Sequence, residues 1–306
     1  MSRRLDSAAV RARIEAARGY VFDLDGSLVL GDKNNNALTA LPGAVALLEL
    51  LDARRIPWLV MTNGTVRTPA GISLELAKAG LPVPAGKIVT PATVAAAYFK
   101  SRKMSTIIVL GVEGVWQPIA DAGLEVVLPA EGDAGADSAD AIFVGWYRQV
   151  HMDEIEVACN AIWRGARLYC ASMVPYFAVR HGRALGSSRA IAAMITSVTG
   201  RRATTLGKPS QHALRTAANL IGCKPSELVV VGDDPDLEVK MALAGSALAV
   251  GVHTGIAGAD EFAALPPERQ PQLSFADVAG LRDYLGGSDI VVKRYHGHSC
   301  ARNFTD

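Results

Sequence analysis

Short runs of apolar and β-branched residues alternate with alanine-rich stretches of helical spacing along most of this sequence. Residues 19–24, 56–62 and 228–231 are three of the expected strands, and each borders a stretch expected to be helical. Because this alternation is typical of parallel strands joined by helices, it predicts an α/β fold. Prolines and glycines near Pro84 and Gly186 interrupt the alternation and separate an inner series of elements from two outer ones.

The order of these elements predicts one domain interrupted by another. A chain of 306 residues is long enough for about two domains, and the polar residues discussed below fall mainly in its outer parts. We expect residues 1–84 and 186–287 to form one discontinuous domain and residues 85–185 to form an inserted α/β domain. Residues 288–306 are polar and contain glycine, so we expect a loosely ordered tail.

Composition and charge exclude several classes of partner. The 31 Lys and Arg nearly balance the 30 Asp and Glu, which leaves no electrostatic footprint for nucleic acid. The uncharged stretch 241–259 contains four glycines and is too polar for a membrane-spanning helix. Residues 3–18 lack the apolar core of a signal peptide, so we expect a cytoplasmic protein with no membrane partner. The four cysteines show no C-x-x-C spacing, and we expect them to be reduced.

Two carboxylates, Asp23 and Asp25, follow the first apolar run directly, and Gly26 begins a turn after them. Open α/β sheets place their ligand sites at the carboxyl ends of strands. Two carboxylates this close repel each other unless a cation or a shared proton lies between them. The pair therefore indicates a candidate catalytic or metal site, although a surface turn with two solvated acids explains the pair alone equally well.

Two more segments carry groups that suit a phosphate. Thr62, Asn63 and Gly64 follow the second strand and offer a hydroxyl, an amide and backbone N–H groups. Lys208 precedes an expected helix, where its ammonium can neutralise an oxyanion as a point charge. Taken alone, T-N-G is more often an ordinary turn, and a single lysine is more often an exposed charge.

A further apolar strand ends in acids at Asp233 and Asp234. Oxygen-rich sites of this kind suit Mg²⁺, which accepts few protein ligands and keeps several waters. Each of the four segments is a weak signal by itself. The four segments occur in this order along the chain, and each lies at the end of an expected strand or the start of an expected helix. Together they are a strong signal of a functional site.

On these motifs the sequence resembles the haloacid dehalogenase (HAD) superfamily of Mg²⁺-dependent phosphohydrolases. D-x-D-G-S at 23–27, Thr62, Lys208 and G-D-D at 232–234 occur in the order of the family's motifs. The long segment between Thr62 and Lys208 is similar to the large-capped branch, the NagD-like or 4-nitrophenylphosphatase-like (type IIA) subfamily. The resemblance covers about residues 19–285 and implies a Rossmann-like core with an inserted cap that acts on a small phosphorylated metabolite.

The resemblance also implies a covalent mechanism. Asp23 would attack phosphorus in line and form an aspartyl-phosphate. Asp25 would protonate the leaving alcohol and then deprotonate the water that hydrolyses the intermediate. The environment of each acid would determine that one acts as the nucleophile and the other as the acid and base.

Further positions receive roles from the same resemblance. Asp23, the backbone carbonyl of Asp25, and Asp233 would hold Mg²⁺, while Lys208 and Thr62 would hold the transferring oxygens. The remaining family positions are Asn63 and Gly64 for phosphate binding, with Asp234 and Glu238 behind the metal and the lysine.

The sequence departs from the family mainly in the inserted domain. Tyr147 and Arg148 occupy positions where the branch often has Asp, and residues 171–175 replace the usual N-P-D of the cap loop. Glu238 stands where relatives commonly have Asp, and its carboxylate should leave metal binding intact. We also consider a homodimer formed through the cap. The candidate substrate-contacting residues are Tyr147, Arg148, Ser172, Met173 and Tyr176.

Other functions remain open at this stage. A catalytically silent HAD-fold protein could bind a phosphorylated metabolite, but it would have no reason to keep both Asp23 and Asp25. A HAD phosphotransferase would use the same residues. Carbon–halogen cleavage is disfavoured because its leaving group needs no acid such as Asp25. A dinucleotide-binding enzyme is disfavoured because no G-x-G-x-x-G follows the first strand.

Overall fold

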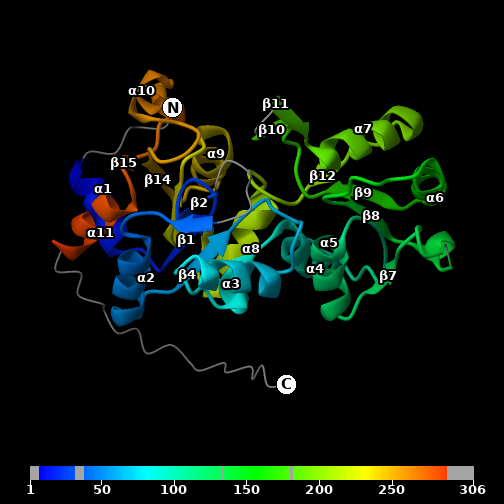
Figure 1. Ribbon diagram of the computed structural model, residues 1–306, viewed down its shortest axis with the longest axis horizontal. Helices are drawn as coiled ribbons and strands as arrows, with labels where there is room; N and C mark the ends of the chain where they lie inside the picture. Colours follow the sequence, from blue (N-terminus) through cyan, green and yellow to red (C-terminus); the bar gives the residue numbers. More distant parts are fainter. Residues whose placement is uncertain (1–6, 32–37, 133, 180–181, 288–306) are drawn as a thin grey trace.

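The computed structural model describes residues 7–31, 38–132, 134–179 and 182–287. The tail predicted at 288–306 lies outside these described residues. The chain forms two parallel sheets that lie side by side, each with helices on both faces (Figure 1). The predicted α/β class is therefore confirmed.

The larger sheet has six parallel strands in the order β15-β14-β13-β1-β4-β5. Its central strand, β1, is buried along its whole length, as expected for a parallel strand covered on both faces. The strands are β1 (Gly19–Asp23), β4 (Trp58–Met61), β5 (Ile88–Val89), β13 (Leu228–Gly232), β14 (Leu248–Val252) and β15 (Leu273–Phe275).

Alternate residues of β1 face opposite layers of helices. Phe22 packs in a cluster with residues from α1, α2, α3 and α11, whereas Val21 packs with residues from α8 and α9. This period of two produces one apolar core on each face of the sheet. The helices around this sheet are α1 (Ser7–Glu15), α2 (Ala44–Ala53), α3 (Pro69–Lys78), α8 (Gln211–Ile221), α9 (Lys240–Ala244), α10 (Ala259–Ala264) and α11 (Val278–Gly286).

The smaller sheet has five parallel strands in the order β12-β9-β8-β6-β7. Its strands are β6 (Thr106–Leu110), β7 (Glu125–Val127), β8 (Ala141–Val144), β9 (Arg167–Cys170) and β12 (Thr204–Thr205). Helices α4 (Pro91–Ser101) and α5 (Glu113–Asp121) cover one face, and α6 (Met152–Trp163) and α7 (Ser187–Thr199) cover the other. The cluster under α4 is continuous with the one under α8, so one apolar core joins the two sheets.

Two short strands pair with sheets that disagree with the expected limits of the inserted domain, residues 85–185. Ile88–Val89 lies inside the expected insertion, but it pairs with β4 of the six-stranded sheet. Thr204–Thr205 lies outside the expected insertion, but it pairs with β9 of the five-stranded sheet. The boundaries at 85 and 186 therefore separate strands from their own sheets, and we propose residues of about 90 to 206 as the inserted cap.

Shorter elements complete the fold. The antiparallel hairpins are β2 (Val29–Gly31) with β3 (Leu38–Ala40) and β10 (Tyr176–Val179) with β11 (Gly182–Leu185). Single turns of 3-10 helix are η1 (Ala85–Lys87), η2 (Ala136–Ser138), η3 (Pro225–Glu227) and η5 (Pro267–Arg269), and η4 (Pro235–Val239) is a π-helical turn. The chain enters α9 directly from η4.

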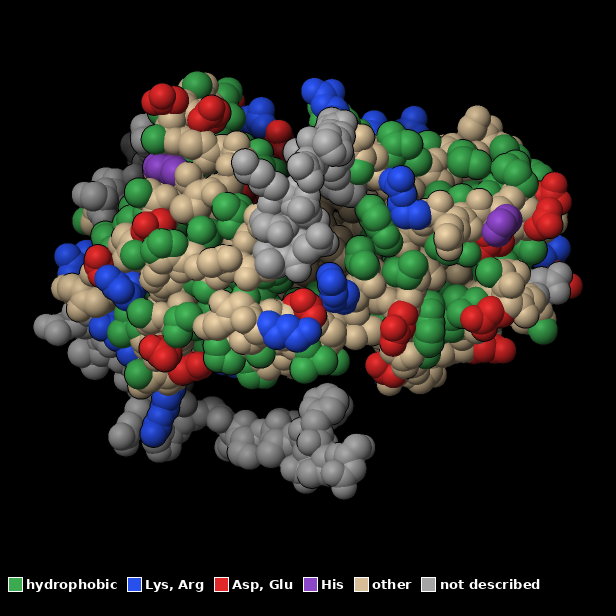
Figure 2. All heavy atoms as spheres, viewed as in Figure 1, with side chains coloured by type: hydrophobic (Ala, Val, Ile, Leu, Met, Phe, Trp, Pro, Cys, Tyr) green, Lys and Arg blue, Asp and Glu red, His purple; other side chains and the backbone are tan. Residues whose placement is uncertain are grey.

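Charged side chains of both signs are interspersed on the face shown in Figure 2. This distribution agrees with the nearly balanced charge of the sequence, +1 at pH 7. Among the helices of the described ranges, none combines the length and the apolar character needed to cross a membrane.

Candidate active site

The carboxyl end of β1 forms the centre of the site. Asp23 is the last residue of β1, pairs in register with Met61 of β4, and is 6% exposed. The chain then turns at Gly26, which has φ +87°. A Cβ on Gly26 would lie 2.7 Å from Asp233 Oδ2 and 3.0 Å from the Cα of Gly255. Glycine is therefore required both for the turn and for the close approach of the neighbouring loops.

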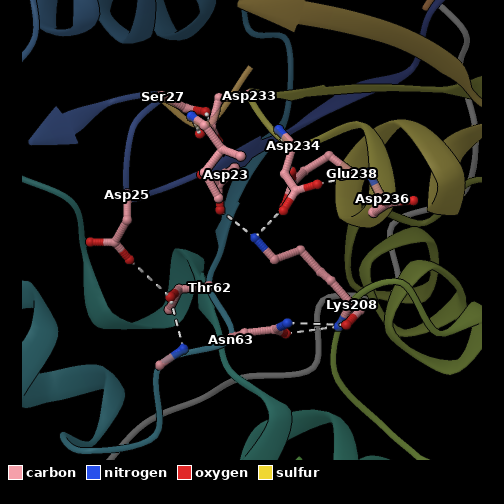
Figure 3. Close-up of polar contacts among 12 residues, drawn as sticks. Asp23, Asp25, Ser27, Thr62, Asn63, Lys208, Asp233, Asp234, Asp236 and Glu238 are labelled. Carbon is pink, nitrogen blue, oxygen red and sulfur yellow. Dashed lines mark hydrogen bonds and ion pairs between the residues drawn. The ribbon is translucent and has the colours of Figure 1, made fainter. Parts of the chain in front are cut away.

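Lys208 lies beside Asp23, although 185 positions separate them in the sequence. Its ammonium contacts Asp23 Oδ1 and also lies 2.6 Å from Glu238 Oε1 (Figure 3). Burial lowers the pKa of Lys208, but the charges of Asp23 and Glu238 outweigh this effect and hold the pKa above its ordinary value. The lysine is therefore a fixed positive charge against Asp23.

Asn63 fixes the backbone of Lys208. Its side-chain amide accepts from the Lys208 N–H at 2.8 Å and donates to the Lys208 carbonyl at 3.0 Å. Next to it, the Gly207 N–H donates to the Ala171 carbonyl at 3.0 Å. We expected Asn63 to bind phosphate, but its amide instead connects β4 to the loop before α8. Ser210 then caps α8 by accepting from the His212 N–H at 3.0 Å.

Asp25 points away from Asp23 and toward Thr62 (Figure 3). The Thr62 hydroxyl lies 3.4 Å from Asp25 Oδ2 and accepts from the Gly64 N–H at 2.9 Å. Asp25 reaches solvent, yet desolvation by the surrounding chain raises its pKa, and the charge of Asp23 raises it further. Two acids of one turn are thus held in different surroundings, one against a lysine and one against a hydroxyl.

The carboxyl end of β13 supplies Asp233. Its Oδ1 accepts from the Ser27 hydroxyl at 3.4 Å, and its Oδ2 accepts from the Ile256 N–H at 2.6 Å. Burial and the charge of Asp23 raise its pKa to about 6. Asp234 caps the following turn by accepting from the Asp236 N–H at 2.7 Å, and burial raises its pKa.

These oxygen atoms fit a small, hard cation. Within the ranges that the structure describes, no three His, Cys, Asp or Glu side chains gather closely enough to form a complete metal cluster. Mg²⁺ does not require one, because it binds through one or two carboxylates and keeps several waters. Asp23 and Asp233 are both buried, and, after burial itself, the negative charge of Asp23 contributes to the raised pKa of Asp233. A cation between them would relieve the repulsion between the two carboxylates.

Comparison with known proteins identifies this arrangement. A haloacid dehalogenase-like hydrolase model matches residues 20–125, and a HAD-hydrolase-like model matches residues 205–281. A dihydroxyacetone phosphatase from Corynebacterium glutamicum (strain R) is 30% identical over 248 residues, which are 81% of this chain and 85% of that protein. The chain belongs to the haloacid dehalogenase-like hydrolases.

Other relatives agree with the predicted branch. An acid sugar phosphatase from Staphylococcus haemolyticus (strain JCSC1435) is 26% identical over 263 residues, 85% of this hydrolase and 94% of that protein. The structure of NagD from E. coli K-12 shares the fold, with a TM-score of 0.75 at 22% identity over 90% of this chain and 99% of that one. The predicted NagD-like membership and the prediction of a phosphatase-type enzyme are confirmed.

The candidate cap residues of this hydrolase differ in their contacts and exposure. The Tyr147 hydroxyl donates to buried Glu154 at 2.7 Å, and its ring packs in the cap core. Arg148 lies 5.7 Å from the ring centre of Trp146. Met173 and Tyr176 are 41% and 44% exposed, and the Ser172 hydroxyl accepts from the Val174 N–H at 3.2 Å. Tyr147 thus supports the cap, whereas Met173 and Tyr176 remain available for contacts.

The segment that follows β14 also contributes to the site, although no sequence motif pointed to it. Thr254 donates from its hydroxyl to the Gly26 carbonyl, and Ile256 donates to Asp233. Gly255 lies between them, where a Cβ would lie 1.9 Å from Asp233 Oδ2. The same signal that revealed Asp23 could have revealed this segment, because it also follows the carboxyl end of an expected strand.

We expect Glu238→Ala to lower the free energy of unfolding by about 1.5–3 kcal/mol, because it removes a buried hydrogen bond to the Lys208 ammonium while Asp23 remains as the partner of Lys208. Asp236→Ala removes an exposed carboxylate from its ion pair with Arg269, in which the two side chains are 68% and 48% exposed, and should cost about 0–1 kcal/mol. Urea unfolding monitored by circular dichroism measures both variants. Equal losses would show that the Lys208–Glu238 pair does not stabilise the site.

Proposed function

We propose that this hydrolase cleaves small phosphate monoesters by transferring the phosphoryl group to Asp23. The observation that carries the proposal is the separation of the two acids, Asp23 against Lys208 and Asp25 toward Thr62. Two of the relatives described above are named dihydroxyacetone phosphatase and acid sugar phosphatase, which supports small phosphorylated substrates for this chain.

In the first step, a carboxylate oxygen of Asp23 attacks phosphorus. A bond forms between that oxygen and phosphorus while the bond from phosphorus to the ester oxygen breaks. Asp25, in its protonated form, gives its proton to the departing alcohol oxygen. Because Asp25 lies on the exposed side of the turn, it can reach a leaving group that enters from solvent.

In the second step, water attacks the phosphorus of the aspartyl-phosphate. Asp25, now ionised, takes a proton from that water, and the bond between phosphorus and Asp23 breaks. Inorganic phosphate leaves, and both acids return to their starting states. Asp25 thus alternates between acid and base, and the Thr62 hydroxyl, 3.4 Å away, orients it.

Fixed charges and donors stabilise the transferring phosphoryl group. The Lys208 ammonium is already held against Asp23, so it needs no reorganisation when negative charge moves onto the phosphoryl oxygens. The Thr62 hydroxyl, which lies beside Asp25 and receives the Gly64 N–H, would offer a second polar group to the phosphoryl oxygens (Figure 3). Asn63 contributes indirectly, because its two hydrogen bonds fix the Lys208 backbone.

Asp23, Asp233 and the backbone carbonyl of Asp25 would hold Mg²⁺. The ion would screen the repulsion between an anionic nucleophile and a phosphate dianion. Asp233 is positioned for this by the Ser27 hydroxyl and the Ile256 N–H. Asp234 caps the following turn and stands behind this set of ligands.

A panel of phosphate monoesters tests the proposal. We expect phosphate release that requires Mg²⁺ and is lost with a chelator. Ca²⁺ should support little turnover, because its larger and looser shell permits bidentate binding of a carboxylate such as Asp23. Released phosphate is measured with each ion at matched concentration, and full activity in the chelator would contradict the proposed metal dependence.

A further inference from the structure

A second pocket lies at the amino ends of the cap strands β6, β8 and β9. It has a volume of about 600 Å³ and is lined by the residues that directly precede these strands or begin them. The active site lies toward the opposite ends of the strands, where Ala171 follows β9 and its carbonyl accepts from Gly207 beside Lys208. The length of the cap sheet therefore separates this pocket, the cap pocket, from the catalytic residues.

The cap pocket carries an excess of positive charge. Its cationic side chains are those of Arg102, Lys103, Arg164 and Arg167. Two carboxylates also line it. Asp140 Oδ2 already accepts from the Ser105 N–H at 2.7 Å and the Thr106 N–H at 3.2 Å. Asp137 pairs with Arg164 at 2.6 Å, but its side chain is 89% exposed, and such exposed pairs are weak.

Lys103 occupies a backbone position that suits glycine. It follows α4 with φ +57°, in the left-handed region that L side chains rarely adopt. Gly80, Gly123 and Gly165 occupy the corresponding positions after α3, α5 and α6, whereas Arg55 after α2 and Ser246 after α9 also keep a side chain there. Glycine would adopt this conformation without strain, and the lysine that stands there instead places an ammonium at the edge of the pocket.

We propose that the cap pocket binds a small polyanion that carries two or more phosphate groups. Guanidinium groups match phosphate oxygens in a bidentate geometry, and lysine adds a point charge. The cations come from the end of α4, the end of α6 and the start of β9, so elements on both faces of the cap sheet contribute them. The volume falls within the range of small-molecule sites, about 300–1,000 Å³.

Inorganic pyrophosphate is the probe for calorimetric titration of the full chain in a chelating buffer at low salt. The pocket variant is Arg102→Gln with Arg167→Gln. The matched control is Arg201→Gln with Arg202→Gln, which removes two exposed arginines elsewhere. We expect wild type and control to bind alike and the pocket variant to bind at least about tenfold more weakly, since charged hydrogen bonds are lost. Citrate, a carboxylate polyanion, should bind at least about tenfold more weakly than pyrophosphate.

Lys103→Gly separates binding from folding. We expect it to weaken pyrophosphate binding while leaving the thermal midpoint unchanged or higher, because glycine relieves the left-handed backbone. Unchanged affinity in both pocket variants would place pyrophosphate in the active site and overturn the proposal. Equal affinity for citrate would overturn the assignment to phosphate.

Discussion

Asp23→Asn should abolish turnover and leave no covalent phosphoryl group on the protein. The amide cannot form the bond to phosphorus that begins the proposed reaction, and losing a nucleophile costs on the order of 10⁴-fold or more in kcat. The Lys208 ammonium keeps Glu238 as a partner at 2.6 Å, so we expect the variant to fold. Acid quenching of wild type and variant with ³²P-labelled substrate measures the adduct directly.

Asp236→Asn is the matched control for this experiment. Asp236 lies on the turn after β13, its side chain is exposed, and it pairs with Arg269 rather than with Lys208. We expect nearly full activity and a normal adduct in this control. Label on Asp23→Asn that is stable to acid and released by hydroxylamine would show that a different carboxylate is the nucleophile.

The sequence predicts where the candidate catalytic residues lie because parallel strands share one geometry. Asp23, Thr62 and Asp233 each follow an apolar run, and β13, β1 and β4 lie next to one another in the sheet. The carboxyl ends of parallel strands lie at the same edge of a sheet whatever the order of the strands, so these residues could be placed at one edge before the order was known. The predicted location depends only on recognising each run as a strand.

Local sequence patterns of this kind do not predict which distant segments will contact each other. The amide of Asn63 suggested a phosphate donor, but its hydrogen bonds go to Lys208, 145 positions away. Tyr147 suggested a substrate contact, but its hydroxyl bonds Glu154 inside the cap. Which partner satisfies a polar group depends on packing in three dimensions, and residue type alone does not reveal it.

The expected cap boundaries differ from the strand pairing for a related reason. Strands β5 and β12 have two residues each, which is too short for a pattern of burial to develop. Their sheet is defined only by the strand to which they hydrogen-bond, β4 in one case and β9 in the other. Proline and glycine mark turns near a boundary, but they do not say to which sheet the next strand belongs.

Asp25→Asn should affect alkyl and aryl phosphates to different extents. General acid catalysis contributes about 10²–10⁴-fold when the leaving group needs a proton, as an alkyl alcohol does. Nitrophenolate leaves without one, so kcat/KM for nitrophenyl phosphate should fall much less than kcat/KM for an alkyl ester. Steady-state kinetics of both esters on wild type and variant measure the two ratios, and equal losses would show that Asp25 is not the acid.

The same variant should also slow the second step, because the asparagine cannot take a proton from the attacking water. With nitrophenyl phosphate, the first step stays fast while the aspartyl-phosphate accumulates, so a burst of nitrophenolate should precede slow turnover. Thr62→Val is the companion variant, since it removes the hydroxyl 3.4 Å from Asp25 Oδ2 and keeps both acids. Thr62→Val should slow both chemical steps, but by less than Asp25→Asn does. A burst with one nitrophenolate per active site in Asp25→Asn, together with its absence in Asp23→Asn, would assign the two carboxylates to separate roles.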